Sequence, residues 1–148
     1  MQSILDQAHT WFLESIHYAN ELSIRLVEGK RRGEPTSLKV GDSEIGGVYP
    51  LESDESSRRV VVYFVNPVAW QTVDESFTAW DESEERDGKA FLQILTKSKY
   101  LDYVDRAHGW YKDVLGGACH YRLWTENEVM DVVAPKPPRV EWTQPADC

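Results

Sequence analysis

Three side chains near the C-terminal end of the chain, those of His120, Arg122 and Asp131, are of types that could do chemistry together. A histidine beside a carboxylate can act as a general base, because the carboxylate fixes the tautomer of the ring. The same group, next to Trp124, could also bind an anionic ligand. The alternative interpretation is a cross-strand ion pair between Arg122 and Asp131, which would contribute about 0.2–1 kcal/mol to stability.

A β-hairpin over residues 120–134 would position these side chains. Its predicted turn has Glu126 and Asn127 at the tip, and asparagine tolerates the left-handed backbone that such turns need. With this loop, Arg122 lies opposite Asp131, and alternation sends successive side chains to opposite faces. The face of Arg122 then carries His120, Trp124, Val129, Asp131 and Val133, and the other face carries Tyr121, Leu123, Met130 and Val132.

Residues outside the hairpin decide whether this cluster is more than an ion pair. The cluster is a candidate functional site only if Glu75, Ser98 or Tyr100 converges on it. The sequence places no nucleophile beside a base, and it lacks the glycine-rich phosphate loops, the nucleophile elbow and the His-Glu-x-x-His zinc motif. A hydrolase is therefore the least favoured function. The missing motifs favour a protein that is not an enzyme and that holds no metal or cofactor.

A second candidate site is the acidic segment, residues 74–89, which has seven acidic and two basic residues. Phe77 and Trp80 lie among its carboxylates. Such a segment would attract a basic protein over long range, and an exposed aromatic ring could anchor that protein. The alternative is a solvated loop whose aromatic rings turn into the core. The chain has six tryptophans, and we expect some of them to line a groove or an oligomer contact.

The elements that position these residues follow from hydrophobic periodicity. Apolar residues at steps of three and four predict a long amphipathic helix over residues 3–28. A second helix is predicted over residues 97–107, capped by Thr96 or Ser98. Between and after the helices, β-branched and aromatic runs predict strands. The predicted fold is α+β: a mostly antiparallel sheet of about five to seven strands with both helices packed on one face.

Length and composition set the wider limits. The chain has 148 residues with a net charge of −9, and its size predicts one domain over residues 1–148, ending in a proline-rich tail, residues 135–148. The negative charge argues against a nucleic-acid partner. No apolar run is long enough for a membrane helix, and the first residues do not resemble a signal peptide. The chain has two cysteines, Cys119 and Cys148, and we expect Cys119 to be buried. Because so few cysteines are typical of a reducing compartment, a cytoplasmic protein is predicted.

Three blocks of the sequence resemble a family of small uncharacterised bacterial proteins. They are residues 70–77, residues 97–103, and the C-terminal pattern of residues 120–122, residues 129–133 and Pro138. The resemblance covers about residues 60–140 and leaves out the N-terminal region. It implies no activity. It does imply a link to small acidic proteins that act as immunity partners of toxins.

These observations favour a non-enzymatic module that binds a basic protein, in the manner of an immunity protein or antitoxin. The partner-binding residues would be His120, Arg122, Asp131, Trp124, Glu75, Trp80 and Tyr100. The alternative function is binding of a small molecule in a pocket between the sheet and its helices. Such a pocket would be lined by Trp70, Tyr100, Tyr103, Trp124 and His120.

Overall fold

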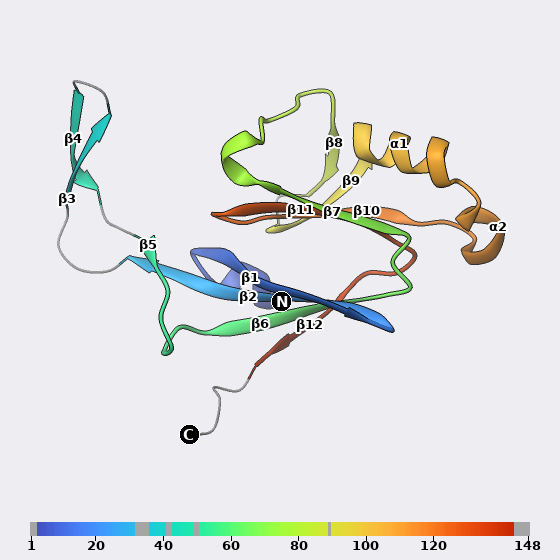
Figure 1. Ribbon diagram of the computed structural model, residues 1–148, viewed down its shortest axis with the longest axis horizontal. Coiled ribbons are helices and arrows are strands. Elements are labelled where there is room, and N and C mark those ends of the chain that lie inside the picture. Colours follow the sequence, from blue (N-terminus) through green and yellow to red (C-terminus); the bar gives the residue numbers. More distant parts are fainter. Residues whose placement is uncertain (1–2, 32–35, 41–42, 49–50, 89, 144–148) are drawn as a thin grey trace.

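A computed structural model describes residues 3–31, 36–40, 43–48, 51–88 and 90–143 of the chain. Within these residues, two antiparallel β-sheets lie face to face, and two short helices lie on the outer side of one of them (Figure 1). The fold is therefore mostly β. The predicted α+β fold with a long N-terminal helix is wrong.

The first sheet has the strand order β1-β2-β6-β12, and β5 pairs with β2 beside this path. All of its pairs are antiparallel. A short 3₁₀ turn, η1 (Ile4–Gln7), precedes it. The strands are β1 (Thr10–Ala19), β2 (Glu21–Arg31), β5 (Leu51–Glu52), β6 (Arg59–Val65) and β12 (Arg139–Trp142).

The second sheet has the order β7-β11-β10-β9-β8, again antiparallel throughout. Its strands are β7 (Ala69–Asp74), β8 (Glu85–Asp87), β9 (Leu92–Lys97), β10 (Cys119–Trp124) and β11 (Glu128–Ala134). A separate hairpin of β3 (Thr36–Val40) and β4 (Ser43–Val48) extends away from both sheets (Figure 1).

The N-terminal region is a β-hairpin and not a helix, and the reason lies in its finer pattern. Leu22, Ile24 and Leu26 are fully buried and alternate with polar residues, which is the period of a strand. In β1 an irregularity between Leu13 and Ser15 shifts the alternation by one residue. The shifted apolar spacing imitates a helical stripe. Asn20, with a φ of 66°, makes the turn between the two strands.

The main core lies between the two sheets. Trp11, Ile24 and Phe64 from the first sheet meet Tyr121 and Met130 from the second. Burial of these large side chains is the main stabilising term of such a fold. The four residues predicted to share one face of the β10–β11 hairpin do share it, and they point into the main core: Tyr121, Leu123, Met130 and Val132. Arg122 pairs with Asp131 as expected from the two-residue loop.

The tip of the β10–β11 hairpin covers part of the free edge of β1. The amide of Asn127 accepts a hydrogen bond from the backbone N–H of Leu13 (2.8 Å) and donates one to the carbonyl of Leu13 (3.0 Å). The backbone N–H of Glu126 donates to the carbonyl of Trp11 (2.9 Å). Because an unpaired edge strand is a site for aggregation, these contacts protect the sandwich as well as joining its two sheets.

Two helices follow β9 on the outer face of the second sheet (Figure 1). They are α1 (Lys99–His108) and α2 (Tyr111–Leu115). The side chain of Ser98 caps α1, which confirms the second predicted helix and one of its two predicted caps. Val104, Tyr111 and Val133 form a small second core beneath these helices.

Three smaller predictions also have an outcome. Cys119 is exposed, so its predicted burial is wrong, and Cys148 lies outside the described residues. The expected tail contains strand β12, and residues 144–148 are again outside the described part. Among the described residues, the helices are too short and too polar to cross a membrane.

Candidate functional site

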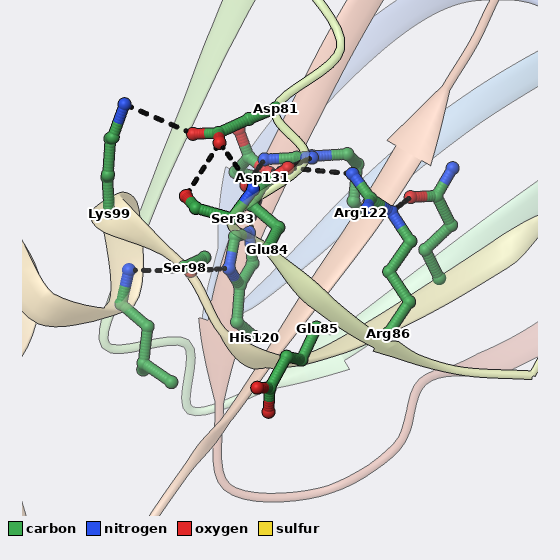
Figure 2. Close-up of polar contacts among 12 residues, drawn as sticks. Asp81, Ser83, Glu84, Glu85, Arg86, Ser98, Lys99, His120, Arg122 and Asp131 are labelled. Carbon is green, nitrogen blue, oxygen red and sulfur yellow. Dashed lines mark hydrogen bonds and ion pairs between the residues drawn. The ribbon is translucent and has the colours of Figure 1, made fainter.

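The polar cluster on the outer face of the second sheet is centred on Asp131, in β11 (Figure 2). Its Oδ1 lies 2.6 Å from Nε2 of His120 and accepts a hydrogen bond from Nε of Arg122 at 2.8 Å. Its Oδ2 accepts a weaker one from Gln71 at 3.2 Å. The cross-strand pair of Arg122 and Asp131 is therefore part of a larger buried network.

The network keeps Asp131 ionised. Burial alone would raise the pKa of this carboxyl, but the hydrogen bond from His120 and the positive charge of Arg122 outweigh burial and lower the pKa. The ring of Tyr100 packs edge-on against His120, with centroids 5.4 Å apart. Burial, and then the charge of Asp131, raise the pKa of Tyr100 to about 12.

Ser98 links the network to α1. Its Oγ accepts a hydrogen bond from the backbone N–H of Leu101 (3.0 Å) and lies 2.6 Å from Nδ1 of His120. One proton assignment satisfies every atom: the Ser98 hydroxyl donates to Nδ1, and Nε2–H of His120 donates to Asp131. Ser98 is therefore both the helix cap and a partner of the buried imidazole.

Arg122 links the network to the acidic segment. Its two terminal nitrogens donate to the two carboxylate oxygens of Glu84 at 2.7 and 2.8 Å, a bidentate pair (Figure 2). Glu84 also accepts a hydrogen bond from Arg86 at 2.7 Å. The side chains of Arg122 and Glu84 are almost fully buried. The acidic segment is thus clamped onto the sheet through charges that it buries.

The contacts that run from Ser98 through His120 to Asp131 contain the groups of a serine hydrolase: nucleophile, base and orienting acid. Burial argues against that chemistry here, since the three residues are 3%, 0% and 3% exposed. The Ser98 oxygen is also occupied as a helix cap. A substrate carbonyl has no route to it unless α1 moves. The arrangement can hold structure together, but it presents no reactive atom to solvent.

The surface of the acidic segment is different from its buried side. Phe77, in η2 (Glu75–Phe77), is 83% exposed and Trp80 is 60% exposed. The interpretation in which both rings turn into the core is therefore wrong. Asp81 is held ionised, because hydrogen bonds from Ser83 and then the ammonium group of Lys99 lower its pKa to about 2. The segment presents aromatic rings among carboxylates.

The predicted site residues fall into two adjoining groups. His120, Arg122, Asp131 and Tyr100 meet in the buried network, and Ser98 converges on them. The other group consists of Glu75, Trp80 and Trp124: Nε1 of Trp124 donates to Glu75 at 3.2 Å, and the two indole rings are 6.1 Å apart.

Sequence reasoning missed Glu84, Arg86 and Gln71 as members of the network. Arg122 and Glu84 are 38 residues apart, and no local pattern connects them. A usable signal was the pairing of opposite charges at Glu84 and Arg86, two residues apart at the start of a strand, where both side chains can point to one face.

The residues expected to line a small-molecule pocket do not gather around one space. Trp70 packs against the main core between the sheets, whereas Tyr103 is exposed on α1. A hollow at the surface of α1 is lined by Lys99, Asp102, Tyr103, Arg106 and Ala107. Among the described residues, no group of three or more His, Cys, Asp or Glu side chains is placed to hold a metal ion.

Comparison of the chain with protein-family models, with curated proteins and with solved structures found no match. The resemblance to small bacterial proteins therefore stays a prediction.

Proposed function

We propose that the chain is a non-enzymatic module that binds a basic protein through its acidic segment. The observation that carries the proposal is the exposure of Phe77 and Trp80 in a segment that is clamped to the sheet by buried ion pairs. Tryptophan is enriched among the residues that dominate binding energy at interfaces, and a ring held on a fixed segment can serve in this way.

The exposed charges of the acidic segment support a basic partner. Asp74, Glu82, Glu85 and Asp87 are exposed along the segment. The opposing arginines, Arg86 and Arg122, are turned inward toward Glu84. The outward field of the segment is therefore negative, in line with the net charge of −9. Inhibition of a basic toxin by such an immunity-like protein is one concrete form of this function.

The test is a binding experiment with a charge-matched control. The immobilised chain is exposed to a lysate of its source organism, and retained basic proteins are identified and eluted with salt. The test variant carries Glu82→Gln, Glu85→Gln and Asp87→Asn. The control variant carries Glu55→Gln, Asp102→Asn and Asp113→Asn, which removes the same charge elsewhere on the surface.

We expect the wild-type chain and the control to retain the same basic protein at low salt, and the test variant to lose it. Raising the salt from about 50 to 300 mM should release the partner, because exposed charges are screened at that ionic strength. Equal retention by both variants, or retention that ignores salt, would refute the proposal.

A second candidate function, hydrolysis, has one observation in its favour: the contact of Ser98 with His120 and of His120 with Asp131. It is tested with a fluorophosphonate probe, which labels an activated serine. We expect no labelling, because the hydroxyl is buried. Labelling that disappears in Ser98→Ala would instead show a hydrolase whose α1 opens.

A further inference from the structure

Trp80 is exposed on the surface but is supported from below. The guanidinium carbon of Arg86 lies 3.8 Å from the centroid of its ring, which is cation–π stacking. The ring of Trp124 lies against it at 6.1 Å and 41°. Because Trp80 is nevertheless 60% exposed, the face that Arg86 leaves free is the one open to a partner.

Arg86 itself has little freedom. Its Nη2 donates to Glu84 at 2.7 Å, and its Nε donates to Gln93, in β9, at 2.9 Å. Glu84 is in turn held by Arg122, and Arg122 by Asp131 (Figure 2). A continuous chain of charged hydrogen bonds thus connects a buried strand residue to the underside of an exposed indole ring.

A side chain fixed before binding loses little conformational freedom on binding, and this raises affinity. Trp80 lies in a net-negative segment, in which Glu82, two residues along the chain, is exposed, and this charge favours a cation on the free face of the ring. A guanidinium group fits this place better than an ammonium group, because it stacks flat on a ring while its edge still donates to carboxylates. Arg86 already stacks in this way on the other face.

We propose that Trp80 is the anchor of the interface, that its free face takes an arginine side chain of the basic partner, and that Arg86 is the positioning residue that holds Trp80 ready. This inference rests on the proposed function, since it names the group that the acidic segment recognises. Arg86 acts only through Trp80 and does not itself contact the partner.

The first test compares hexa-arginine with hexa-lysine as probes, by calorimetric titration at about 50 mM salt. The wild-type chain should bind hexa-arginine more tightly. Trp80→Leu should weaken hexa-arginine binding about fivefold, the size expected for one exposed cation–π contact, and should abolish the preference over hexa-lysine. The control, Trp110→Leu, removes another tryptophan that is 80% exposed and should change neither affinity.

The second test uses the sign of a charge effect. Arg86→Gln makes the acidic segment more negative, so simple attraction predicts tighter binding of hexa-arginine. If Arg86 positions Trp80, binding should become weaker, and the near-ultraviolet circular dichroism of the Trp80–Trp124 pair should decrease. In a Trp80→Leu background, Arg86→Gln should have no further weakening effect, because the two residues act as a unit.

The outcomes separate the two proposals. Equal binding of both peptides, unchanged by Trp80→Leu but lost in the Glu82, Glu85 and Asp87 variant, overturns the anchor and leaves the acidic surface standing. Tighter binding by Arg86→Gln overturns its positioning role. Binding that none of these variants alters would overturn both the anchor and the proposed function.

Discussion

Asp131 is the centre of the buried polar network on the second sheet. It accepts from Arg122, His120 and Gln71, and through them it reaches Ser98, Glu84 and Arg86. Buried charges are costly unless each one is paired and hydrogen-bonded. Removing one member leaves the others unpaired in the interior, so this residue should control stability more than its size suggests.

The first prediction concerns the acid stability that Asp131 contributes. Its pKa in the folded chain lies below the ordinary value of about 3.9. The stabilisation is therefore present above about pH 4 and is lost as the pH falls toward the folded-state value. At pH 7, Asp131→Asn should reduce the free energy of unfolding by about 3 kcal/mol. Urea unfolding at several pH values measures this.

The difference between wild type and Asp131→Asn should become smaller below pH 4, because the wild-type carboxyl is then protonated as well. A difference that stayed constant from pH 7 to pH 3 would contradict the assignment of this ionised carboxylate to the stability of the fold.

The second prediction concerns Ser98. Ser98→Ala removes the cap of α1, at a cost of about 1 kcal/mol, and leaves Nδ1 of buried His120 without a partner, at a further cost of about 1 kcal/mol. The expected loss of about 2 kcal/mol is measured by denaturant unfolding. Ser98→Thr keeps the hydroxyl and should retain most of the stability. Equal losses in both variants would mean that the hydroxyl is not the stabilising group.

At the scale of the elements, the most buried contact between the acidic segment and the sheet is the ion pair of Glu84 with Arg122. Glu84 is the only residue of Asp81–Glu85 whose carboxylate binds the two buried arginines in the described contacts. Loops without such a contact open locally at little cost. The buried pair therefore determines whether Phe77 and Trp80 are presented as a defined surface.

The third prediction tests this clamp. In Glu84→Gln, Arg122 and Arg86 face each other without the carboxylate between them, so residues 78–88 should detach locally. Their backbone amides should exchange with deuterium at least tenfold faster, which corresponds to about 1.4 kcal/mol, while amides of α1 and β10 keep their protection. Glu85→Gln, an exposed neighbour of the same type, serves as the control and should change neither.

The elements also show what the sequence could predict. The β10–β11 hairpin and α1 were predictable because their signals are local: a two-residue turn and a serine cap. The N-terminal hairpin was not, because the irregularity after Leu13 makes a strand pattern imitate a helix. The clamp between Glu84 and Arg122 joins residues 38 positions apart. Hydrophobic periodicity is a local pattern and cannot predict such a contact.

At the scale of the molecule, the two sheets are joined by more than their shared core. Asn127, at the tip of the second sheet's hairpin, hydrogen-bonds both backbone groups of Leu13 at the edge of the first. The side chains of Thr10 and Glu126 add a further contact of 2.6 Å. The edge strand is thereby fixed in place.

The fourth prediction follows from this junction. Asn127→Ala removes the two hydrogen bonds to Leu13 and the one that Asn127 accepts from Thr125, and should lower the free energy of unfolding by about 1–2 kcal/mol. It should also uncover the edge of β1 and raise the rate of aggregation, measured by light scattering at 37 °C. Glu126→Gln keeps the backbone contact to Trp11 and is the control. Unchanged aggregation in Asn127→Ala would show that the tip does not protect the edge.

The same junction bears on how the chain acquires its shape during synthesis. Leu13 emerges from the ribosome 114 residues before Asn127, the partner that completes its strand edge. The apolar face of the first hairpin therefore stays uncovered until the second sheet has also been translated. Such distant pairing makes folding slow, and the newly made first hairpin is a natural client for molecular chaperones.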